Sequence, residues 1–270
     1  SISSNTMILN AGKLVTTGYG VVYIGEGCGD VATTGYYNTG MGRDCLGSLT
    51  TGVQNHGIGA NTLLSVTTGN HNVAMGTQAG QSITTGNGNV CLGNVAGVHR
   101  TTGSDLVAVG NSACYKNTTA GQNIAVGGAA LYMNETGDNN TAMGTNALYL
   151  CTGANNTAVG RYANMLLTTA NANQSFGTNA GYHTTTGDGN INLGGSPSSA
   201  TSSYEITLGT TSHSTLRCND TSISSLSDER DKTEIVDLPI GLDFLNTLKP
   251  RQFKWKTRDG NIKDNRIDAG

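Results

Sequence analysis

The sequence has few of the residues from which compact globular domains are built. Aromatic residues make up 5% of its 270 residues, charged residues make up 12%, and proline occurs three times. So few bulky side chains leave little material for a single globular core. The 39 glycines follow no three-residue period, which excludes collagen. The sequence also lacks a run of about 18 apolar residues, so it predicts no membrane-spanning helix.

Charge is scarce as well. The net charge is −3 and the basic residues form no block, so nucleic acid is not an expected partner. The start of the chain does not have the pattern of a signal peptide, and it begins at Ser1 rather than at a methionine. We therefore expect residues 1–15 to be an N-terminal fragment.

What the sequence does contain is an internal repeat. An apolar residue followed by glycine recurs eleven times at an interval of seventeen residues, with one interval of sixteen. A period of this length is typical of stacked units, so we predict an all-β rod of parallel coils, a β-roll or β-helix, rather than a pocket enzyme. These rung glycines are Gly25, Gly42, Gly59, Gly76, Gly93, Gly110, Gly127, Gly144, Gly160, Gly177 and Gly194.

One repeat unit is illustrated by Thr67–Ile83. Its Thr-Thr-Gly step predicts a turn, because glycine supplies positive φ there. The Asn-x-Ala-apolar-Gly stretch that follows alternates with a period of two, which predicts a short strand. A single unit buries too few side chains to offset its conformational entropy. Neighbouring coils must therefore stabilise it, and we expect other subunits to help.

Asparagine stands four positions before the rung glycine in nine of the eleven units. Equivalent residues of successive coils stack about 4.8 Å apart, so these amides would form a hydrogen-bonded ladder along the rod. We assign them a structural role, because binding sites rarely need nine copies in line. The nine residues are Asn38, Asn55, Asn72, Asn89, Asn123, Asn140, Asn156, Asn173 and Asn190.

The six cysteines follow the repeat rather than a pattern of their own. Cys28 and Cys45 lie three residues after a rung glycine, where later units carry alanine, and Cys91 replaces the alanine of the strand. The sequence has no Cys-x-x-Cys pair and no Cys/His cluster, so we interpret cysteine as a small buried residue and expect no metal or other cofactor. Assembly in a reducing compartment such as a host cytoplasm fits this use best.

The repeat is similar to known repeats. The segments Asn72–Gly76, Asn123–Gly127 and Asn156–Gly160 resemble the N-x-A-φ-G repeats in the head domains of trimeric autotransporter adhesins, and similar repeats occur in phage tail fibres. The resemblance covers about residues 16–195, although the period here is longer than is typical of the adhesin heads. It implies a left-handed parallel β-roll in a homotrimer, intertwined or side by side, with the apolar faces of three chains packed inward.

The composition changes after Gly195. Residues 1–195 hold twelve charged residues and residues 196–270 hold twenty-one, and all three prolines lie in the second part. This shift predicts domain boundaries. We expect the repeat shaft to cover residues 16–195, a connector like a narrow three-chain β-prism to cover 196–226, and a partly helical domain to begin at 227.

The last part of the chain carries three motifs in order, S-D-x-R-x-K, G-L-D-F-L-x-x-L-K-P and F-x-W. This succession resembles the start of the endosialidase-type intramolecular chaperone, the self-cleaving C-terminal module of phage tail fibres and tailspikes. The resemblance implies that Ser227 is a nucleophile, that Lys232 is its base, and that the bond between Leu226 and Ser227 is cleaved. Alone, the first motif would fit a solvated charged turn better. The sequence stops at Gly270, before the elements that usually complete this module, so we expect an incomplete chaperone.

A Ser-Lys pair is chemically reasonable. A hydroxyl is a poor nucleophile until a neighbour accepts its proton, and an amine does so only when desolvation or nearby charge lowers its pKa. Contacts within a trimer could supply that burial. Any enzymatic activity would then be a single autoproteolytic event rather than turnover.

The leading hypothesis is a virion tail-fibre protein that binds a host receptor. It would act as a homotrimer together with other tail proteins, and by analogy its receptor is a surface glycan. Candidate contacts lie in the turns, and they are Tyr36, Tyr37, His56, His71, His99 and Arg100.

Three alternatives stay open. A monomeric ice-binding or adhesive solenoid is suggested by threonine pairs such as Thr67 and Thr68, but adjacent threonines point to opposite faces of a strand. A bacterial trimeric surface adhesin is the second. A polysaccharide-cleaving enzyme would need paired carboxylates at fixed spacing. The repeat region has only seven acids, and Asp138 and Asp188 lie in turns.

Overall fold

The structure is a computed structural model that describes residues 6–8, 11–196, 200–210, 212, 215, 252–253 and 268–269. The chain divides into two units, residues 1–215 and 216–270. The described part of the second unit is an antiparallel pair of short strands, β14 (Gln252–Phe253) and β15 (Asp268–Ala269). The first unit is a β-solenoid.

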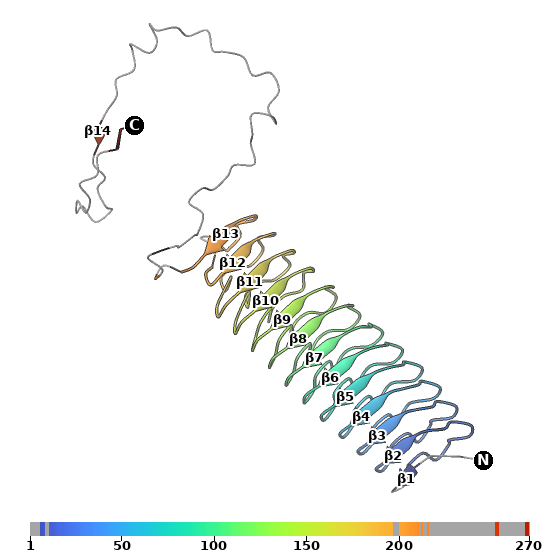
Figure 1. Cartoon of the computed structure of the whole chain (residues 1–270). Helices are drawn as coiled ribbons and strands as arrows, with labels where there is room; N and C mark the ends of the chain where they lie inside the picture. Colours follow the sequence, from blue (N-terminus) through green and yellow to red (C-terminus); the bar gives the residue numbers. More distant parts are fainter. Residues whose placement is uncertain are drawn as a thin grey trace, which may run out of the picture. The chain divides into compact units, whose positions relative to one another are not determined.

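The solenoid is built on one sheet of thirteen parallel strands that pair in sequence order (Figure 1). Each strand has three residues and pairs with the strand of the next coil, so the predicted all-β rod of parallel coils is confirmed. The strands are β1 (Thr6–Ile8), β2 (Val22–Ile24), β3 (Thr39–Met41), β4 (His56–Ile58), β5 (Val73–Met75), β6 (Val90–Leu92), β7 (Val107–Val109), β8 (Ile124–Val126), β9 (Thr141–Met143), β10 (Thr157–Val159), β11 (Gln174–Phe176), β12 (Ile191–Leu193) and β13 (Ile206–Leu208).

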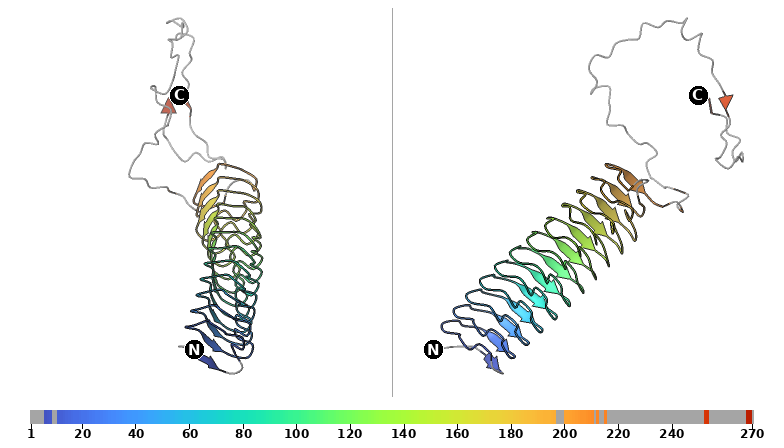
Figure 2. Two further views of the ribbon diagram at one scale, coloured as in Figure 1. Left: turned by 90° about the vertical axis from the view of Figure 1, so that its right-hand side faces the viewer. Right: turned by 180° about the vertical axis from the view of Figure 1, so that it is seen from behind.

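The register of the sheet follows the sequence period. Val73 of β5 pairs with Val90 of β6, and the same offset of seventeen recurs in most pairs. The offset falls to sixteen between β9 and β10, where the sequence has its shorter interval. The strands therefore stack along one side of the coils, as Figure 2 shows from two further directions.

The sheet does not end where the repeat ends. Ile191 of β12 pairs with Ile206 of β13, an offset of fifteen residues. The solenoid therefore continues beyond residue 195, into the segment expected to form a separate connector. The rest of that connector lies almost wholly outside the described residues.

The core of the solenoid is a narrow column of small and medium side chains. The middle residue of each strand from β2 to β12 is buried, and Ala74, Cys91 and Ala108 at this position are at most 1% exposed. Leucines four residues after a rung glycine, such as Leu63 and Leu131, fill much of the remaining interior and are fully buried. Most of the inward-facing apolar residues are alanine or cysteine, with one or two larger side chains per coil, so the core depends on stacking between coils.

The rung glycines are required by close backbone contact. Gly76 has a φ of +126°, and a β-carbon there would lie 2.6 Å from the carbonyl oxygen of Gly93 in the next coil. Gly93 stands in the same relation to Gly110, at 2.4 Å. Side chains cannot be accommodated at such distances, and L residues rarely adopt this φ. The glycines that define the repeat therefore mark the positions where the backbones of successive coils are in close contact.

The cysteines of the solenoid lie inside it. Cys28, Cys45, Cys91, Cys114 and Cys151 are buried and carry free thiols. In the described ranges, no group of three His, Cys, Asp or Glu side chains could hold a metal ion. No helix among the described residues is long and apolar enough to cross a bilayer.

Candidate functional site

The nine asparagines form a continuous hydrogen-bonded column within each of two stretches of the solenoid. Each is fully buried. In a regular coil, Asn55 Nδ2 donates to the Gly69 carbonyl in the next coil at 2.8 Å, and the Asn72 backbone N–H donates to Asn55 Oδ1 at 3.2 Å. Each amide thus satisfies a turn carbonyl and a strand N–H at once. Buried polar groups left without such partners would cost free energy, so this Asn ladder is structural.

The ladder is interrupted where Leu106 occupies the asparagine position. Leu106 cannot donate to the Ala120 carbonyl, which is the acceptor that an asparagine there would reach. Arg100 Nη1 donates to this carbonyl instead, at 2.7 Å. Arg100 Nε also donates to Asn89 Oδ1 at 2.7 Å, so the arginine joins the last amide before the gap to the coil after it.

The prediction that Arg100 is a surface contact is wrong, because its side chain is fully buried. It donates further hydrogen bonds to the Gly103 carbonyl at 3.1 Å, to the Ser104 carbonyl at 2.8 Å and to Asn117 Oδ1. All these acceptors are uncharged oxygens. Burial lowers the pKa of Arg100, and the nearby Cys91 partly opposes that shift.

The other candidate turn residues are accessible. Tyr37, His56, His71 and His99 are exposed, and Tyr36 is half-buried. The Tyr36 ring stacks on Tyr19 of the preceding coil with a centroid distance of 5.2 Å. These residues are spread over several sides of the coil and are not gathered into one site.

The outer face of the sheet carries an unbroken row of apolar residues. We call the first and third residues of strands β2 to β12 the outer sheet face, since they flank the inward-pointing middle residue. The third residue of each of these strands is apolar, and Asp, Glu, Lys and Arg occupy neither position. The first residues are mixed, since Thr39, His56, Thr141, Thr157 and Gln174 are polar. The most exposed third residues, between 40% and 52%, are Met41, Ile58, Met75, Met143, Phe176 and Leu193. Exposed apolar rows of this length are typical of interaction surfaces.

The threonine turns use their hydroxyls internally. Thr50 Oγ1 donates to the Thr67 carbonyl at 3.0 Å, and Thr84 Oγ1 donates to the Thr101 carbonyl at 3.3 Å. The second threonine of such a pair, for example Thr51, is exposed. Only one threonine in each coil therefore faces solvent in this column.

A row of stacked aromatic rings follows one edge of the coils. Tyr115, Tyr132 and Tyr149, here called the tyrosine ladder, each lie five residues after a rung glycine. Their ring centroids are 4.9 and 5.0 Å apart with interplanar angles of 2° and 13°. His99 meets Tyr115 edge-on at 4.8 Å. The equal register of these tyrosines was visible in the sequence, but the sequence-based candidates did not include them.

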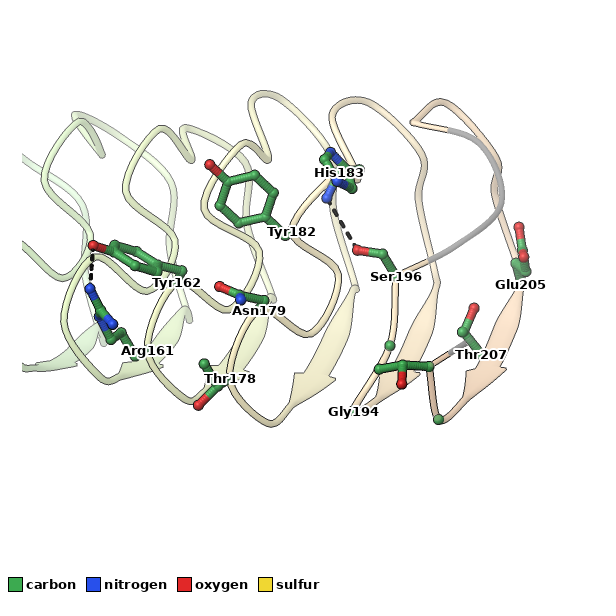
Figure 3. Close-up of a pocket in the computed structure, with 13 residues that line it drawn as sticks. Arg161, Tyr162, Thr178, Asn179, Tyr182, His183, Gly194, Ser196, Glu205 and Thr207 are labelled. Carbon is green, nitrogen blue, oxygen red and sulfur yellow. Dashed lines mark hydrogen bonds between the residues drawn. The ribbon is translucent and has the colours of Figure 1, made fainter. Parts of the chain in front are cut away.

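A hollow of about 1140 Å³ lies near β12 and β13. Figure 3 shows its wall, with Arg161 and Thr178 close to the strands and Tyr182 on the next edge of the coil. Arg161 lies over the Tyr162 ring at 4.3 Å, and its Nη2 donates to the Tyr162 hydroxyl at 2.8 Å. The His183 backbone N–H donates to Ser196 Oγ at 3.2 Å. Glu205 also lines this hollow.

The proposed catalytic residues cannot be placed. Ser227, Lys232 and Leu226 lie outside the described residues, so their roles remain predictions.

Comparison with known protein families gives a match in the C-terminal part of the chain. Residues 227–270 match the family described as the chaperone of endosialidase. No curated protein and no solved structure matches the chain.

Proposed function

We propose that the chain is part of a virion tail fibre that assembles as a homotrimer and attaches to a host cell surface. The observation that carries this proposal is the match of residues 227–270 to the chaperone of endosialidase. That match follows a β-solenoid, which is a suitable shaft because it extends by repetition rather than by enlarging a core. The chaperone part would assist assembly of the shaft and then be released.

The outer sheet face is our proposed trimer interface. Its third-residue row is apolar in every strand from β2 to β12, and Asp, Glu, Lys and Arg are absent from both of its rows. A second and third copy present the same face at the same height, so three chains in register would cover one another's apolar residues. The narrow core of one chain gives a further reason for such packing, because burial between chains adds to the little apolar area buried within one.

We propose that release occurs at the bond between Leu226 and Ser227. The Ser227 hydroxyl adds to the Leu226 carbonyl, Lys232 accepts the hydroxyl proton, and the acyl group moves from the Ser227 nitrogen to its oxygen. That nitrogen takes up a proton, and water then hydrolyses the ester. The family match begins at Ser227, the residue that would become the new N-terminus.

Mass spectrometry and light scattering on the full-length protein test these steps. We expect the wild-type protein to split after Leu226, whereas Ser227→Ala and Lys232→Ala should remain intact. Equal cleavage in all three proteins would contradict the Ser-Lys pair. The solution mass should correspond to three chains, and a monomer mass would favour a lone ice-binding or adhesive solenoid instead.

Substitutions on the outer sheet face test the interface. Ile124→Glu and Met143→Glu each place a carboxylate among exposed apolar side chains, and we expect them to reduce the trimer to monomers or aggregates. Thr169→Glu, at an exposed turn position, is the matched control and should leave the solution mass unchanged. A trimer that tolerates both carboxylates would place the interface elsewhere.

A further inference from the structure

Two hollows lie on the same side of neighbouring coils of the solenoid. The smaller, of about 560 Å³, is bounded by Tyr132, Tyr149 and Met165. The larger, of about 1140 Å³, begins at Arg161 in the same coil as Met165 and continues towards β13. Both have the same construction, with the two residues after a rung glycine on one side and the fifth residue on the other. We call these two hollows together the flank groove.

We propose that the flank groove binds a linear, hydroxyl-rich polysaccharide laid along the axis of the solenoid. This inference rests on the proposed function as an attachment protein, and it names the site and the class of receptor.

The groove favours a polymer because its chemistry repeats. Successive rings of the tyrosine ladder lie 4.9 and 5.0 Å apart, and the opposite wall repeats with the same coils. A ligand made of repeating units can meet equivalent groups in each coil. Its contacts then add along the groove, so weak contacts at each coil sum to useful affinity.

The walls of the groove suit hydroxyl groups. The side-chain amides of Asn146 and Asn179 have no hydrogen-bond partner within the described part of the chain, although both line the groove. Each amide both donates and accepts, as ligand hydroxyls do. Tyr132 and Tyr149 add apolar ring surface and hydroxyls that can donate and accept. A tyrosine hydroxyl is protonated near neutral pH, and desolvation raises the pKa of Tyr132 further.

The charges in the groove argue against other polymers. The wall over Tyr132 and Tyr149 carries no charged residue, whereas a nucleic acid would require a basic one. Further along, Arg161 and Glu205 bring one charge of each sign. The groove as described therefore suits a neutral or weakly charged chain.

The groove also leaves the outer sheet face uncovered. None of its lining residues is a first or third residue of β2 to β12, and Figure 3 shows Arg161 and Thr178 beyond the carboxyl ends of the strands. A trimer held by the outer sheet face can therefore keep three such grooves accessible.

A glycan array tests the inference. The full-length protein would be applied to linear oligosaccharides from disaccharides to octasaccharides and to linear bacterial surface polysaccharides. We expect binding that strengthens with chain length, because longer ligands contact more coils. Tyr132→Ser combined with Tyr149→Ser should weaken binding about tenfold or more. Tyr132→Phe keeps the ring stack, loses only a hydroxyl, and should have a smaller effect.

The control is Tyr19→Ser, which removes another tyrosine with a stacked neighbour, lies outside the groove and is not a candidate contact. It should bind as the wild type does, and all variants should retain the wild-type solution mass. Absence of binding to every linear glycan would overturn the inference, as would binding that is independent of chain length. If the groove variants bind as the wild type does, attachment through a glycan stands and the flank groove is not its site. The trimer and cleavage experiments decide the proposed function separately.

Discussion

The regular coils around Asn55 and Asn72 and the irregular coil around Leu106 solve one problem in two ways. In both, a turn carbonyl of the next coil must receive a hydrogen bond inside a narrow interior. In the regular coils an asparagine donates it over 2.8 to 2.9 Å. In the irregular coil Arg100 donates it from the coil before, at 2.7 Å. The fold therefore constrains the position of a donor more strongly than the identity of the residue that supplies it.

The two solutions differ in how they could fail. An asparagine carries no charge, and its loss leaves one carbonyl and one N–H without a hydrogen-bond partner. Arg100 carries a buried charge and serves several acceptors at once, so more depends on it.

The largest effect should follow from removing the arginine. Arg100→Ala leaves the Ala120 carbonyl and Asn117 Oδ1 without a donor and removes one of the donors to the Gly103 carbonyl, and we expect the free energy of unfolding to fall by about 4 kcal/mol or more. Urea denaturation measures this loss. Arg43→Ala is the control, because Arg43 is exposed and makes only a 3.7 Å ion pair, so it should cost less than about 0.5 kcal/mol. Similar losses in both variants would contradict the role given to Arg100.

A regular coil should lose less. Asn72→Ala removes the donor to the Gly86 carbonyl and the acceptor for the Asn89 backbone N–H, and about 2–3 kcal/mol should be lost. Asn70→Ala provides the comparison, because Asn70 makes similar bonds on the exposed side and should cost under about 1 kcal/mol. If both cost the same, burial is not what gives the Asn ladder its importance.

A double-mutant cycle tests whether asparagine and arginine are alternative donors to the Ala120 carbonyl. Leu106→Asn alone should be slightly destabilising, because Arg100 already occupies the space and the acceptor. In the Arg100→Ala background the same substitution restores a donor to Ala120, and we expect about 2 kcal/mol to be recovered. Additive effects of the two changes would mean that asparagine and arginine are not alternatives at this coil.

The smallest effect concerns the thiols in the two regions. Burial raises the pKa of Cys91, beside Arg100, to about 12, and that of Cys151 to about 12. Thiolate, the reactive form, is therefore scarce at pH 8, and neither residue should react with iodoacetamide before unfolding. Cys218, the sixth cysteine, is changed to serine so that only the five cysteines of the solenoid can be labelled, and peptide mapping then locates the label. Faster labelling of Cys91 than of Cys151 would show that the irregular coil opens more often.

Much of the fold could be predicted because each repeat unit corresponds to one coil. The rung glycines mark the coil-to-coil contacts, and the asparagine spacing follows from strands that pair with the next coil. Arg100 could not be assigned in this way, since its burial depends on a missing amide at Leu106 in the following coil. An arginine alone in a turn is normally solvated. One feature of the sequence could have indicated it. Arg100, Asn117 and Asn134 all lie seven residues after a rung glycine, so polar residues occupy this position next to the unit in which Leu106 replaces asparagine.

The candidate site was less predictable. Turn residues were considered one at a time, so exposed residues such as Tyr37 and His71 were preferred. Tyr115, Tyr132 and Tyr149 become a site only when coils are stacked in register, which brings residues far apart in sequence side by side. The continuation of the sheet at Ile206 was missed as well, because its coil is two residues shorter than a regular unit and has Glu205 at the asparagine position, although Leu208-Gly209 keeps the apolar-glycine step.

Pairing restricted to adjacent coils also bears on how such a chain can change in length over evolution. A whole regular unit could be duplicated or lost without altering the partners available to the units on either side, so copy number is free to vary. Arg100 and Leu106 are an exception, since they belong to consecutive units and compensate for each other. Recombination between them would separate the two halves of that compensation, so this stretch should be inherited as a block.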